Sequence, residues 1–155
     1  MWKDLRVTKR DIRYGFPSHL GRDLGRRARH IYSHNNSVDP VAVARDLGLE
    51  VREGPLPQGM LGGVDKSNLT GRVIILSENL DEREKRFACS QLIGHYLHIR
   101  TDDETNEWIQ YRDPESSVGR YAEEIFAVEF AKNLLVPHIY HDVARRFENI
   151  RDWIS

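Results

Sequence analysis

The chain has 155 residues, 39% hydrophobic and 30% charged, which is the composition of a soluble globular protein large enough for one core. It has no apolar run of the roughly 20 residues that cross a bilayer, and Cys89 as its only cysteine excludes an intramolecular disulfide and a multi-cysteine zinc site. The N-terminus lacks the apolar stretch of a secretory signal. We therefore expect a cytoplasmic protein without a membrane partner.

The net charge of −1 conceals a basic N-terminal segment. Residues 1–30 contain nine Lys and Arg against three Asp, so this segment is +6 and the remainder is −7. We assign residues 1–21 to a basic N-terminal arm and residues 22–155 to a single domain. Lys9, Arg10 and Arg13 are candidates for binding nucleic-acid phosphates. The alternative is a solvated arm that neutralises part of the acidic body, and no nucleic-acid motif accompanies the charge.

The first half of the chain predicts two helices and three strands. Residues 22–33 have apolar side chains at helical spacing. Asp39 followed by Pro40 is typical of the start of a short helix, which Gly48 ends. Three strands are then predicted between turn signals: an alternating one at 49–52, a glycine-rich one at 60–64 and a third at 71–77.

The second half predicts helices. Asp81 and Glu84 form a capping box ahead of a helix over residues 82–98. Polar residues indicate an exposed loop over 101–118, and two further helices are predicted over 119–135 and 138–154. The sum is an α+β domain with N-terminal helices, a small three-stranded sheet, a motif helix and C-terminal helices.

The motif helix contains the sequence 87-FACSQLIGHYLHI-99. A zinc hydrolase places two ligands at positions i and i+4 of one helix, and a Glu beside the first ligand activates the metal-bound water. Here Gln91 and His95 have that spacing. A Gln side chain is a poor zinc ligand, and Leu92 stands where the general base belongs. Apolar neighbours in this stretch are expected in the core: Phe87, Leu92, Ile93 and Leu97.

The order of these motifs resembles the ImmA/IrrE family of bacterial and phage metallopeptidases. The similarity runs from about Leu24 to Pro137 and includes 39-DPVAVARDLGLEVREGPLP-57 and 72-RVIILSE-78. The family pattern R-F-x-x-x-H-E-x-G-H-Y-L compares with 86-RFACSQLIGHYL-97. The pattern E-x-x-A-N-x-F-A-x-x-L-L-x-P compares with 124-EIFAVEFAKNLLVP-137. The resemblance implies a zincin-like fold.

The resemblance also implies roles for single positions. The second zinc histidine of the family falls on His95 and its glutamate ligand on Glu124. The first zinc histidine falls on Gln91, the catalytic glutamate on Leu92 and a following asparagine on Val128. Two of three ligands are retained, while the general base is lost. Peptidases of this family cleave helix-turn-helix repressors.

Alternatives remain at several residues. His95 and Glu124 could hold residual metal, or could form a buried ion pair in its place. We expect His98 at the surface or rim of the motif helix. We expect Cys89 to be a packed core thiol, not a nucleophile paired with His95. A divergent zinc site could recruit a third ligand from three further histidines, His98, His138 and His141.

Three functions follow as hypotheses. The first is an inactive pseudopeptidase without a cofactor, which binds a transcriptional repressor or a host regulatory protein, as the resemblance to phage and mobile-element regulators implies. The second is a divergent zinc peptidase that cleaves a helix-turn-helix repressor. The third is a DNA-binding regulator that uses the basic N-terminal arm.

Overall fold

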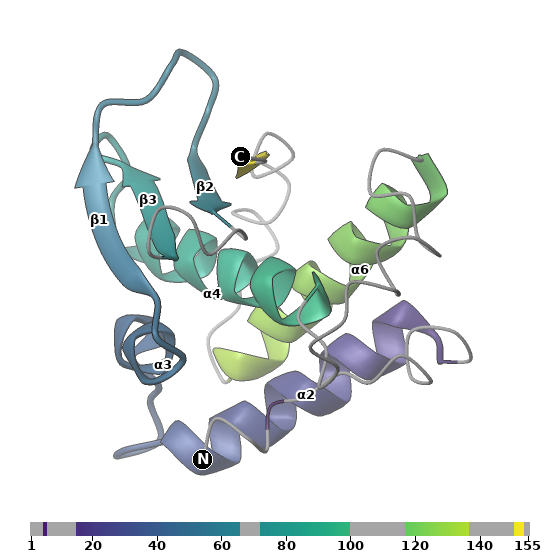
Figure 1. Cartoon of the computed structure of the whole chain (residues 1–155). Helices are drawn as coiled ribbons and strands as arrows, with labels where there is room; N and C mark the ends of the chain where they lie inside the picture. Colours follow the sequence, from purple (N-terminus) through teal and green to yellow (C-terminus); the bar gives the residue numbers. More distant parts are fainter. Residues whose placement is uncertain (1–4, 6–14, 66–71, 100–116, 137–150, 154–155) are drawn as a thin grey trace.

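The computed structural model describes residues 5, 15–65, 72–99, 117–136 and 151–153 (Figure 1). The secondary structure in these ranges is mixed, with helices flanking a small sheet, as the α+β prediction requires. In chain order the elements are α2 (Pro17–Tyr32), α3 (Pro40–Asp46), β1 (Glu50–Gly54), β2 (Gly62–Asp65), β3 (Val73–Ser77), α4 (Glu82–Ile99), α6 (Ser117–Leu134) and β4 (Arg151–Trp153).

The sheet has the strand order β1-β3-β2-β4. Strand β1 pairs parallel with β3, β2 pairs antiparallel with β3, and β4 pairs parallel with β2. The three predicted strands are therefore confirmed, and a fourth joins them. The predicted helix over residues 138–154 is wrong at residues 151–153, which form β4 because backbone pairing with β2 is available there. The predicted loop over 101–118 is wrong at residues 117 and 118, which form the start of α6. Residues 138–150 and 101–116 lie outside the described residues.

The elements form successive layers (Figure 1). Helix α4 packs against β2 and β3 on one side and against α6 on the other, and α2 lies along α6. Helix α3 contacts both β1 and α4. The motif helix α4 is therefore the central layer, and its faces meet the sheet and the helix that carries Glu124. No helix in the described ranges is both long and apolar enough to cross a membrane.

Capping interactions fix the starts of α3 and α4. The Asp39 carboxylate accepts a hydrogen bond from the Val41 amide at 3.0 Å. At α4 the Glu84 amide donates to the Asp81 carboxylate at 2.8 Å, and the Asp81 amide donates to the Glu84 carboxylate at 3.0 Å. Both caps satisfy amides that have no partner within the helix. Both predicted helix starts are confirmed.

Helix α2 begins earlier than predicted. It starts at Pro17, a residue whose fixed φ suits the first helical position, whereas the prediction began at residue 22. The first five residues of α2 therefore lie in the range that we assigned to the arm, and Leu5 of that range is buried with 2% of its surface exposed. The division into an arm and a domain stays a prediction.

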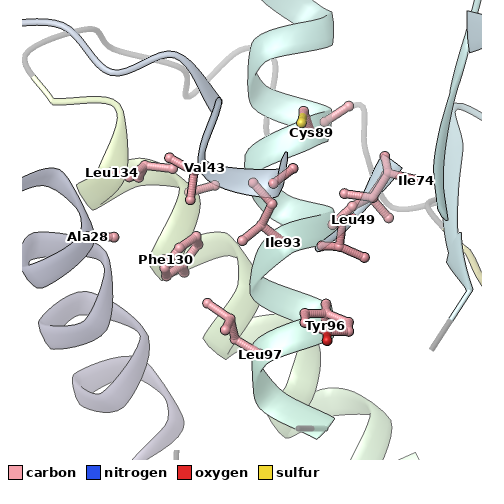
Figure 2. Close-up of a cluster of buried hydrophobic side chains, with 14 of the residues drawn as sticks. Ala28, Val43, Leu49, Ile74, Cys89, Ile93, Tyr96, Leu97, Phe130 and Leu134 are labelled. Atoms are coloured by element: carbon pink, nitrogen blue, oxygen red, sulfur yellow. The ribbon is translucent and has the colours of Figure 1, made fainter. Parts of the chain in front are cut away.

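One hydrophobic core joins the layers. Figure 2 shows Ala28 of α2, Phe130 of α6 and Ile93 of α4 among its members. The four residues of the motif helix that we expected in the core are all fully buried or nearly so: Phe87, Leu92, Ile93 and Leu97. Burial of such side chains stabilises a fold by about 1.5–3 kcal/mol each. The motif helix is thus anchored on its apolar faces, which fixes the position of its polar residues.

Candidate functional site

A close helix contact brings α4 and α6 together at the candidate site. A Cβ atom on Gly94 would lie only 2.8 Å from the Cα atom of Ala127. Real side chains do not approach so closely, so glycine is needed for the two backbones to pack at this distance. The contact lies between Gln91 and His95 on α4 and next to Glu124 on α6. The small residues therefore set the separation of the polar side chains.

The first polar contact across this seam joins Gln91 to Glu124. The Gln91 Nε2 atom donates a hydrogen bond to Glu124 Oε1 at 2.7 Å. Gln91 is almost fully buried, with 1% of its surface exposed, whereas 36% of the Glu124 side chain is exposed. A carboxylate accepts hydrogen bonds, so the amide must turn its N–H group towards Glu124. The two residues that the resemblance places at ligand positions, Gln91 and Glu124, are therefore bonded directly to each other.

His95 lies between two carboxylates. Its Nε2 atom is 3.5 Å from Glu124 Oε2, and its Nδ1 atom is 3.5 Å from Glu123 Oε1. The predicted pairing of His95 with Glu124 is thus present, at a distance longer than a typical hydrogen bond. Glu123 was not predicted. The sequence feature that could have indicated it is the Glu-Glu pair at 123–124. Side chains of adjacent helical residues point about 100° apart, so two of them can lie on either side of one imidazole ring.

The second polar atom of the Gln91 amide has a different environment. Gln91 Oε1 is buried and has no hydrogen-bond partner among the described residues. An unpaired buried acceptor costs about 1–3 kcal/mol relative to a paired one. The amide therefore gains one strong hydrogen bond to Glu124 and leaves its own acceptor unsatisfied.

Leu92, which the resemblance places at the position of the general base, has a fully buried apolar side chain. It has no exposed surface, and its Cδ1 atom would be 3.1 Å from a Cβ atom placed on Gly62 of β2. The leucine thus packs against the backbone of β2 at Gly62, which has no side chain. An isobutyl group cannot accept a proton, and its burial here excludes water from the position that the family uses for its catalytic glutamate.

His98 and Cys89 both belong to the core. The prediction that His98 lies at the surface or rim is wrong, because it is 3% exposed and its ring centroid is 4.8 Å from that of Phe126. The aromatic surface of α6 covers the last turn of α4 and buries the imidazole. Cys89 is fully buried, and this burial raises the pKa of its thiol to about 12. The expectation of a packed thiol is confirmed.

The remaining predicted residues lie outside the described ranges. These are the two C-terminal histidines His138 and His141, and the basic residues Lys9, Arg10 and Arg13. The contribution of the histidines to a divergent zinc site and that of the basic residues to nucleic-acid binding stay predictions.

The donor set at the family's zinc positions does not fit a zinc ion in this arrangement. Zinc requires lone-pair donors from His, Cys or carboxylate side chains, but Gln91 presents an N–H group towards Glu124. The described residues contain no group of three or more His, Cys, Asp or Glu that could hold a metal ion. The role of His95 and Glu124 as residual ligands stays a prediction that metal analysis tests.

The comparisons with known proteins agree with the motif order. Residues 44–154 match the family model Peptidase_M78, described as the IrrE N-terminal-like domain. This range contains the whole sheet, the motif helix α4 and the glutamate helix α6. No curated protein and no solved structure matches the chain. Because the family match covers more than half of the sequence and contains the site, the chain belongs to the IrrE N-terminal-like family of metallopeptidase domains.

Proposed function

We propose that this chain is a catalytically inactive member of its family, which binds a regulatory protein without cleaving it. The observation that carries the proposal is the hydrogen bond from Gln91 Nε2 to Glu124 Oε1, beside a fully buried Leu92. The first contact occupies the retained glutamate ligand with an N–H donor. The second places an apolar side chain, which cannot accept a proton, where the resemblance expects the base.

The expected loss of activity is large. Removal of a general base alone typically slows a reaction by about 10²–10⁴-fold. Loss of a zinc ligand should reduce activity further. In this class of reaction the metal polarises the substrate carbonyl and activates the attacking water. Within the described residues the helix packing and capping are nevertheless present, with close packing at Gly94 and the capping box at α4. A fold retained without its chemistry supports a binding role.

The resemblance to the family suggests the partner. Its peptidases act on helix-turn-helix repressors, so we propose that the partner here is a transcriptional repressor or a host regulatory protein. A pseudopeptidase would hold such a protein at the site without turnover and would act in proportion to its own concentration.

The experiment is to mix the purified chain with candidate helix-turn-helix repressors, with and without added zinc. Binding is measured by calorimetry and the repressor mass by mass spectrometry. We expect a stoichiometric complex that contains intact repressor under both conditions. Cleavage fragments that appear with zinc and disappear in His95→Ala would contradict the proposal and support the divergent peptidase.

A second candidate function is DNA binding through the basic N-terminal segment. The specific observation is that α2 continues this segment with side chains exposed at Arg26, Arg27 and His30. Binding to phosphates would weaken steeply as salt is raised. Because Leu5 is buried in the core, the arm should be tested by substitution and not by deletion. Unchanged DNA affinity in the triple variant K9Q/R10Q/R13Q would exclude the arm.

A further inference from the structure

We propose that the side chains of Gln91, His95, Glu123 and Glu124 form a binding site for a cationic N–H donor, the guanidinium or ammonium group of a partner protein's Arg or Lys. The inference rests on the proposed function, because it gives the chemistry of the group that the partner presents.

The cluster of Gln91, His95, Glu123 and Glu124 has a net negative charge. The four side chains contain two carboxylates and one imidazole, so their sum is −2 with a neutral His95 and −1 with a protonated one. Either state leaves this cluster negative. A positive group that approaches it gains Coulomb energy, and the gain is larger at a partly buried site than in bulk water.

Gln91 and Glu124 also offer hydrogen-bond acceptors to a ligand. Gln91 Oε1 is buried and has no hydrogen-bond partner among the described residues. It belongs to the same planar amide whose Nε2 binds Glu124 at 2.7 Å, so it lies beside the carboxylate. A carboxylate offers about four lone-pair positions, and Gln91 uses one of those on Glu124. A ligand with several N–H donors and a positive charge would satisfy these acceptors and complement the negative charge of the cluster.

The cluster is accessible to a partner from one side. The Glu124 side chain is 36% exposed, whereas His95 and Glu123 expose only 4% and 11% of theirs. The cluster therefore opens to solvent at Glu124 and becomes more buried towards Gln91. A long side chain with a charged end matches this gradient, because its terminal N–H groups reach inward while its stem stays at the surface. Charge-assisted hydrogen bonds of this type are among the stronger ones in proteins.

The test uses small probes on the metal-free chain, prepared by dialysis against a chelator. Methylguanidinium and methylammonium chloride represent Arg and Lys, and tetramethylammonium chloride supplies the same charge without an N–H donor. The measurement is the ¹⁵N–¹H shift of the Gln91 side-chain amide, assigned from its loss in Gln91→Met. We expect a saturable shift with at least one N–H probe. The probe that binds with the higher affinity indicates whether the partner's residue is Arg or Lys. No saturable shift, or an equal response to tetramethylammonium, would overturn the site.

A matched pair of variants locates the charge. Glu124→Gln keeps the shape and an acceptor oxygen but removes the negative charge, and it should weaken probe binding by about tenfold. Glu129→Gln changes a carboxylate of similar exposure, 30%, on the same helix and should leave binding unchanged. Equal affinity of Glu124→Gln and the natural chain would overturn the site. The outcome is separate from the proposed function, since that proposal fails on zinc-dependent cleavage whether or not methylguanidinium binds.

Discussion

At the scale of single residues, the proposed loss of peptidase chemistry depends on two neighbouring positions. The resemblance places Gln91 at a zinc-ligand position and Leu92 at the position of the base. In the structure Gln91 donates a hydrogen bond to Glu124, and Leu92 packs against Gly62. Both substitutions could be identified from the sequence through the motif pattern. The contacts they make could not, because the distance between α4 and α6 depends on tertiary packing.

Restoring one ligand should restore metal binding but not hydrolysis. In Gln91→His the new imidazole would join His95 and Glu124 on the facing helices, which completes the donor types of a zinc site. We expect a stoichiometric amount of zinc by elemental analysis, and no peptide cleavage while Leu92 remains. Gln91→Asn is the control, because it keeps an amide and should bind no zinc. Zinc content equal in both variants would contradict the account.

Cys89 should be inert in the folded chain. Burial raises the pKa of its thiol to about 12, so at pH 8 only about 10⁻⁴ of the group is thiolate. We expect no reaction with a thiol reagent until denaturant unfolds the protein, and prompt reaction afterwards. A fast reaction under native conditions would show that the thiol is accessible.

The same pKa predicts a pH dependence of stability. The folded pKa is raised above that of the unfolded thiol, close to 9, so between about pH 9 and 12 the unfolded state binds fewer protons. The stabilisation from Cys89 is thus complete below pH 9 and is lost as pH rises towards 12. Urea unfolding at several pH values should show this loss, and Cys89→Ala should lack that component of it.

At the scale of secondary structure, helix starts with side-chain caps were predicted correctly, whereas the uncapped start of α2 and the short strand β4 were missed. Helices α3 and α4 have side-chain caps, and both starts were predicted. Helix α2 has Phe16 at its N-cap with no side-chain hydrogen bond, and its start was placed five residues late. Strand β4 has three residues and depends on pairing with β2. Such pairing between distant segments is not visible in local propensity.

The seam between α4 and α6 should be intolerant of added volume. In Gly94→Ala the new Cβ atom would lie 2.8 Å from Ala127 Cα, so the helices must separate, at a cost of about 1–3 kcal/mol. Urea denaturation measures the loss. Gly54→Ala in β1 is the control, because no atom lies within 4 Å of its added Cβ and the change should be small. Equal stability of the two variants would contradict the close packing.

At the scale of the whole molecule, the basic N-terminal segment is joined to the fold at Leu5. The side chain is 2% exposed and belongs to the core cluster. We expect Leu5→Ala to reduce the free energy of unfolding by about 2–5 kcal/mol. Phe16→Ala removes a larger side chain that is 69% exposed, and it should change stability by less than about 0.5 kcal/mol. The reverse order would show that the segment is separate from the core.

At the same scale, the apolar core is made by residues other than the polar cluster Gln91, His95, Glu123 and Glu124. The hydrophobic core includes apolar side chains from α2, α3, α4, α6 and the sheet. Leu92 even adds to this core. The loss of peptidase chemistry that we propose would leave this apolar core intact.

The most direct test of the central claim is the zinc content of the natural chain, measured by elemental analysis after incubation with excess zinc and removal of the free ion. The account predicts a content far below one zinc per chain, because Gln91 presents its N–H group to Glu124 in place of a ligand. Stoichiometric zinc that is lost in His95→Ala, together with turnover of a peptide, would contradict it.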